Sequence, residues 1–172
     1  IPWQLTDQYV RLRNSCAVPI CTGEDIYLKE NFRPLLEKGG VSVIHPDILT
    51  SGGILENKKI GDLAQEHGVA MAVHMAESPI ACMAAVHSIA ATENFLALEF
   101  HSVDVPWWND LVTGLPKPIV NNGYITVPDK PGLGIDELVD DVIAEHIHPD
   151  YPGIWLPTDE WNNDYSHDRL WS

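Results

Sequence analysis

Short apolar runs alternate with longer helical patterns over the first hundred residues of the chain. The runs are nearly continuous, as is typical of parallel strands buried on both faces; they cover residues 18–21, 41–45, 69–73 and 95–98. The stretches between them show helical spacing with a glycine stop or an initial proline; they cover residues 31–38, 54–68 and 79–91. This alternation predicts an α/β fold built from successive β–α units.

The regular pattern ends near residue 101. Two adjacent tryptophans, Trp107 and Trp108, follow with several prolines and glycines, and an acidic, aromatic tail runs from Trp155 to Ser172. We therefore expect two parts, with the β–α units in residues 1–101 and a C-terminal segment of different character in residues 102–172.

The chain is strongly acidic. Its 25 Asp and Glu residues against 10 Lys and Arg residues give a formal charge of -15. Such a charge repels a polyphosphate backbone and lacks the basic patch of nucleic-acid-binding proteins. No apolar run approaches the roughly 20 residues that span a bilayer. We therefore expect neither nucleic acid nor a membrane as a partner.

The cysteines bear on the cellular location of the protein, and the first residues bear on whether the chain is part of a longer protein. Three cysteines, an odd number without a C-x-x-C pair, favour reduced thiols and a cytoplasmic location over a disulfide framework. The chain starts at Ile1-Pro2-Trp3, without an initiator methionine or a signal-peptide pattern. We expect it to be part of a longer protein.

One ionisable side chain stands at the C-terminal end of each predicted strand. The four are Glu24, Asp47, His74 and Glu99. Their spacing of about 25 residues is close to the length of one β–α unit of a (β/α)8 barrel, in which the strand C-termini converge on the mouth that holds the active site. We therefore expect three carboxylates and one imidazole to face a common cavity.

Two other interpretations of these residues stay open. Strands commonly end in polar residues, so any one of the four is explained without a function. A doubly wound sheet also gathers its strand ends at one edge, so the spacing alone does not choose between that fold and a barrel. The pairing of a carboxylate, Asp47, with a histidine on the next strand, His74, favours a functional interpretation.

An ordered set of motifs resembles the second half of the catalytic barrel in the mandelate racemase/muconate lactonizing type of the enolase superfamily. The motifs are Thr22-Gly23-Glu24, His45-Pro46-Asp47, Ser51-Gly52-Gly53, Val73-His74, Leu98-Glu99 and the run from Pro128 to Gly134. The resemblance implies that residues 1–101 form strands five to eight of a TIM-type barrel. It also implies that residues 102–172 would pack on a capping domain that is missing from this chain.

The resemblance implies a role for each strand-end residue. Glu24 would be a carboxylate ligand of Mg²⁺, a hard cation that prefers oxygen ligands. Asp47 would hydrogen-bond His74, fix its tautomer and raise its basicity, and the two would form an acid/base dyad. Glu99 would be a protonated acid with a raised pKa that donates a hydrogen bond to the substrate carboxylate.

The branch that the motifs resemble, the galactonate/gluconate dehydratases, implies dehydration of a sugar acid (aldonate or aldarate) to a 2-keto-3-deoxy acid. A proton α to a carboxylate is barely acidic, so the enediolate intermediate needs a metal ion and hydrogen-bond donors to stabilise it. The family pattern adds the first half of the barrel, a capping domain and two more metal carboxylates. We therefore expect this part alone to be inactive and the complete enzyme to be a homo-oligomer.

Two other functions stay open. A racemase or epimerase of a 2-hydroxy acid uses the same dyad but returns a proton to C2. A half-barrel without catalytic activity, serving as one part of an assembly, belongs to a different class.

Overall fold

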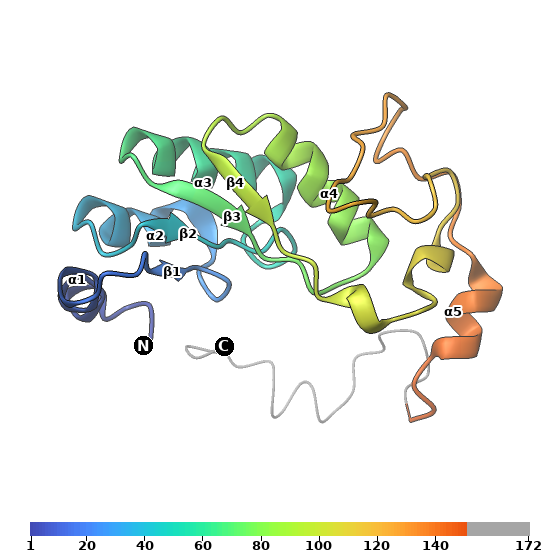
Figure 1. The fold of residues 1–172 in the computed structure, drawn as a ribbon, viewed down its shortest axis with the longest axis horizontal. Helices are drawn as coiled ribbons and strands as arrows, with labels where there is room; N and C mark the ends of the chain where they lie inside the picture. The colour runs from blue at the N-terminus through green and yellow to red at the C-terminus, as the bar shows by residue number, and fades with distance from the viewer. Residues whose placement is uncertain (151–172) are drawn as a thin grey trace.

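The computed structural model describes residues 1–150 of the chain and centres on a parallel sheet (Figure 1). Its four strands are ordered β1-β2-β3-β4, and each pairs in parallel with the next one in sequence. They are β1 (Cys21–Thr22), β2 (Val43–Ile44), β3 (Ala70–Val73) and β4 (Phe95–Leu98). A helix joins each strand to the next, which confirms the α/β fold of successive β–α units.

The connecting helices pack side by side along the sheet (Figure 1). They are α2 (Leu28–Glu37), α3 (Gly53–Glu66) and α4 (Pro79–Ala90), and α1 (Thr6–Ser15) precedes β1 and contacts α2. Between β4 and residue 150 lie two short 3-10 helices and one α-helix: η1 (Ser102–Asp104), η2 (Trp108–Leu111) and α5 (Asp140–His146). None of the helices in the described part of the chain is long and apolar enough to cross a membrane.

The main core lies between the helices and one face of the sheet. Its fully buried side chains include Phe32, Leu35, Ile44, Ile60, Met71 and Val73. In β3, the alternate residues Ala70 and Ala72 point to the other face and are only half-buried. Among the described residues, the sheet is therefore covered on one face, where the sequence predicted burial on both.

The last strand differs most from this prediction. The side chains of Phe95 and Leu96 in β4 are exposed, and no element of residues 1–150 pairs with the outer edge of β4. The apolar composition of the run predicted the strand correctly and its burial wrongly.

Two helices lack the apolar stripe on which a prediction from sequence depends. In α1 only Thr6 and Tyr9 are buried, and α5 has no buried residue. Helix α2 also begins earlier than predicted, at Leu28, whose amide donates to the carbonyl of Ser51 at 3.1 Å. This contact between distant residues leaves no mark in the local sequence.

The described part of the C-terminal segment packs against α4. A second cluster of buried side chains joins the two; it contains Met75, Cys82, Met83, Val86, Trp108, Val112 and Ile119. The predicted tail from Trp155 to Ser172 lies outside the described residues, and the expected contact with a capping domain stays a prediction.

We expect Phe32→Ala to lower the free energy of unfolding by about 3 to 5 kcal/mol, because it removes a fully buried ring and leaves a cavity. Leu55→Ala on the exposed face of α3 is the matched control and should change it by less than about 0.5 kcal/mol. Equal effects of the two substitutions in urea unfolding would contradict this account of the core.

Candidate active site

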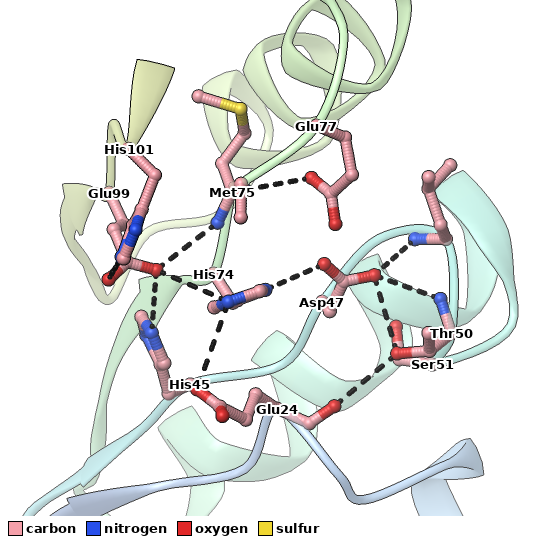
Figure 2. A network of polar contacts seen from close by, with 12 residues as sticks. Glu24, His45, Asp47, Thr50, Ser51, His74, Met75, Glu77, Glu99 and His101 are labelled. Carbon is pink, nitrogen blue, oxygen red and sulfur yellow. Dashed lines mark hydrogen bonds and ion pairs between the residues drawn. The ribbon is translucent and has the colours of Figure 1, made fainter. Parts of the chain in front are cut away.

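The ionisable residues predicted at the strand ends come together at one edge of the sheet (Figure 2). Parallel strands present their C-terminal ends at the same edge, and Asp47 and His74 extend the pairing of β2 and β3 by a further parallel bridge. The Nε2 atom of His74 lies 3.8 Å from the Glu24 carboxylate and 3.6 Å from the Glu99 carboxylate. The structure therefore groups all four side chains, while their roles stay predictions.

The shortest contact among these four side chains joins Asp47 and His74. Nδ1 of His74 lies 2.8 Å from Oδ2 of Asp47, within the range expected of a dyad. Asp47 is 2% exposed, and its Oδ1 accepts the amides of Leu49 at 2.8 Å and Thr50 at 2.9 Å. The carboxylate is held by the following turn, so it orients the imidazole and leaves Nε2 toward Glu24 and Glu99.

The environment shifts the pKa of each member of the dyad toward its charged form. Burial raises the pKa of Asp47, but hydrogen bonds from Glu77, His74 and the backbone outweigh it, so the pKa is below its ordinary value. Burial lowers the pKa of His74, but the hydrogen bond and the charge of Asp47 outweigh it and raise the pKa. The contact with Asp47 therefore stabilises the protonated form of His74, which suits a group that gives or takes a proton.

Glu99 lies between two histidines that the sequence pattern did not single out. Its carboxylate is 3.1 Å from Nε2 of His45 and 2.7 Å from Nε2 of His101. Nδ1 of His45 donates to the carbonyl of Ala72 at 2.9 Å, which orients the ring toward Glu99. The sequence signal that could have identified these histidines is their position next to the ends of two predicted strands.

The expectation of a raised pKa for Glu99 is not met. Burial raises this pKa, but the hydrogen bonds from His101 and the amide of Met75, with the charges of the two histidines, outweigh burial and hold the pKa below its ordinary value. The prediction considered only neighbouring carboxylates and left out the two histidines.

A third carboxyl group beside the dyad, Glu77, has the raised pKa instead. Burial, followed by the hydrogen bond and the charge of Asp47, raises the pKa of Glu77 to about 7. From sequence, the segment around Glu77 resembles a zinc-protease motif only superficially, because the second histidine of that motif is missing. No local signal placed this residue against Asp47, thirty residues earlier in the chain.

Two arrangements are relevant to a metal ion. Ligand atoms of Asp47, His74 and Glu77 lie within 4.8 Å of one another and could hold an ion. However, Asp47 and His74 already bind each other, and a hard cation such as Mg²⁺ prefers oxygen ligands that are free. The Glu24 carboxylate is 56% exposed at the mouth and fits one position of an oxygen-ligand set.

The glycine before Glu24 brings this carboxylate to the mouth. Gly23 has φ +146°, and a Cβ atom there would lie 2.8 Å from the backbone nitrogen of His45 and 2.9 Å from the ring of Phe32. Only glycine permits this close approach of β1 to the end of β2. The position of Glu24 relative to the dyad therefore depends on Gly23.

We expect Asp47→Asn to lower the pKa of His74, because the amide removes the charge that outweighs the burial of the ring. A histidine-ring NMR titration measures this pKa directly. Asp7→Asn is the control, since it removes a carboxylate that is paired with Lys38 at the end of α2. An unchanged pKa of His74 in Asp47→Asn would show that Asp47 is not its main partner.

The sequence and the structure resemble sugar-acid enzymes and their homologues. D-xylonate dehydratase of Haloferax volcanii is 39% identical over 147 residues, which are 86% of this chain and 35% of the relative. D-galactonate dehydratase of Ralstonia pickettii is 35% identical over 134 residues, 76% of this chain and 35% of the relative. The chain therefore spans about a third of the length of these curated relatives.

Solved structures agree with this assignment of the fold. The crystal structure of a mandelate racemase/muconate lactonizing enzyme-like protein from Rubrobacter xylanophilus matches with a TM-score of 0.80 and 38% identity, over 86% of this chain and 37% of that one. The family model for the enolase C-terminal domain-like proteins matches residues 1–141. The four strands and the helices that connect them are thus part of a (β/α) barrel, and the chain belongs to the enolase C-terminal domain-like family.

Proposed function

We propose that this chain supplies part of the active site of a Mg²⁺-dependent sugar-acid dehydratase, which converts an aldonate or aldarate to a 2-keto-3-deoxy acid. The observation that carries the proposal is the buried Asp47 bonded to His74, whose Nε2 faces Glu24 and Glu99. Two relatives named for the dehydration of D-xylonate and D-galactonate support the reaction class. The other parts of the site would come from barrel strands outside this chain.

The dyad provides one of the two proton transfers in such a reaction. Dehydration breaks the C2–H bond and the bond from C3 to its hydroxyl, and the enol that results becomes the 2-keto acid. The base takes the C2 proton, and an acid gives a proton to the departing hydroxyl, which leaves as water. Nε2 of His74 performs one of these transfers while Asp47 holds the ring and balances its charge.

The neighbouring carboxylates bind rather than transfer protons. Glu24 contributes an oxygen ligand to Mg²⁺, which when bound supplies positive charge against the negative charge that develops on the substrate carboxylate. Glu99 faces the same space and hydrogen-bonds the substrate. A racemase or epimerase with the same dyad is the second candidate, because family members with that chemistry share the barrel.

We expect His74→Asn to reduce the turnover of the full-length protein by about 10² to 10⁴-fold with the fold intact, because asparagine keeps a similar size but loses the titratable proton. Asp47→Asn should act in the same direction, and the two losses should be far from additive because the residues act as a unit. His67→Asn, at the exposed end of α3, is the matched control.

The measurement is NMR of a panel of aldonic and aldaric acids in D₂O, following 2-keto acid formation and deuterium at C2. Keto product from the wild type supports dehydration. Deuterated, stereoinverted acid without keto product supports racemisation instead. Wild-type turnover that His74→Asn retains in full would exclude the proposed role of His74, and no turnover of any acid would favour a non-catalytic part of an assembly.

We expect Glu24→Gln to raise the Mg²⁺ concentration for half-maximal activity by at least about tenfold, because even residues that only support metal ligands contribute about 10- to 100-fold to affinity. Glu66→Gln, at the exposed end of α3, removes the same charge away from the mouth and serves as control. Activity that survives exhaustive chelation unchanged would contradict the metal role of Glu24.

A further inference from the structure

Glu77 lies beside the dyad but has no part in the proposed proton transfers. It follows β3 and precedes α4 by two residues. One of its carboxyl oxygens accepts the amide of Ala76 at 2.9 Å, and the other points toward Asp47 (Figure 2). A ligand atom of Glu77 lies within 4.8 Å of those of Asp47 and His74.

The C-terminal segment fixes the backbone at this position. The carbonyl oxygen of Glu77 accepts a hydrogen bond from the indole of Trp108 at 2.8 Å and another from the hydroxyl of Ser102 at 3.4 Å. Trp108 is itself buried in the cluster against α4. The Glu77 side chain therefore starts from an anchored point at the rim of the site, and its position beside Asp47 is built into the fold.

The hydrogen bonds decide which of the two neighbouring carboxyl groups keeps a proton. Two carboxylates this close do not both ionise easily. Asp47 accepts two backbone amides and the imidazole of His74, whereas Glu77 accepts one amide. Asp47 therefore has more hydrogen bonds to stabilise its negative charge. The proton is held by Glu77, on the side that faces Asp47.

We propose that Glu77 is a positioning residue of the dyad, whose protonated carboxyl group donates a hydrogen bond to Asp47 and holds that carboxylate in line with His74. The inference deepens the proposed function and rests on it for its effect on catalysis. The hydrogen bond itself does not depend on the reaction.

The charges around Glu77 support this assignment. The titratable groups facing it are Asp47 after β2, His74 after β3 and the thiol of Cys82 in α4. Burial, followed by the charge of Glu77, raises the pKa of this thiol to about 12, so the thiol stays neutral. Burial and Asp47 raise the pKa of Glu77 to about 7, so its proton is kept in acid and lost above neutrality.

This proton links stability to pH with a definite sign. The pKa of Glu77 is about 7 in the folded protein. In the unfolded chain we expect the ordinary value of about 4.3. Stability from Glu77 is therefore fully present below about pH 4 and is lost as pH rises toward 7. Glutamine keeps an N–H donor for Asp47 and cannot ionise, so Glu77→Gln should remove this loss.

The experiment compares Glu77→Gln, Glu77→Ala and the exposed control Glu66→Gln in the full-length protein. Between pH 5 and pH 8, the melting temperature of Glu77→Gln should rise relative to wild type, while that of Glu66→Gln should follow wild type. In the dehydration assay, Glu77→Ala should lose about tenfold or more in kcat, since a hydrogen bond to a charged group is lost. Below pH 6, Glu77→Gln should keep most of the wild-type kcat. A plot of its kcat against pH should show no inflection near pH 7.

Three results would overturn the inference. The first is a melting temperature of Glu77→Gln that keeps a constant difference from wild type over this pH range. The second is equal activity of the glutamine and alanine variants. The third is a metal ion that co-purifies with the wild type and is lost in Glu77→Gln, because the carboxylate would then be a ligand. If no acid is turned over but the melting temperatures behave as expected, the proposed function fails and the hydrogen bond stands.

Discussion

The hydrogen bond between Asp47 and His74 depends on the turn after β2, whose backbone amides stabilise the buried carboxylate. An isolated charge at 2% exposure would be strongly unfavourable. The amides of Leu49 and Thr50 replace the water that Asp47 loses, so the anion is stable where the next strand ends in an imidazole. The other polar groups at the mouth, Glu24 and Glu99, are arranged around the nitrogen that this bond leaves free.

Protonation at this mouth is set by neighbours rather than by residue type. Three glutamates line the region with different surroundings: Glu24 is exposed, Glu99 lies between two histidines, and Glu77 lies against an anion. The histidines hold the pKa of Glu99 down, and Asp47 holds the pKa of Glu77 up. The same side chain thus has a lowered pKa at one position of the mouth and a raised pKa at another.

Features that depend on periodicity could be predicted from the sequence, and features that depend on tertiary contacts could not. The helix α4 and the strand β3 were placed within a residue or two because their patterns are strong, and the strand-end residues were found because parallel strands end at one edge. Glu77 was missed because its place depends on an indole 31 residues later. The pKa of Glu99 was mistaken because the prediction did not include His45 and His101.

The outer edge of β4 is open to pairing with a further strand. Its backbone groups lack a strand partner among the described residues, and the side chains of Phe95 and Leu96 are exposed. Beside it lies an apolar cavity of about 590 Å³ between β4, α4 and residues 120–127. An uncharged, unpaired edge of this kind is a template for strand addition. A strand added at this edge would pair with the free backbone groups of β4 and lie beside the exposed side chains of Phe95 and Leu96.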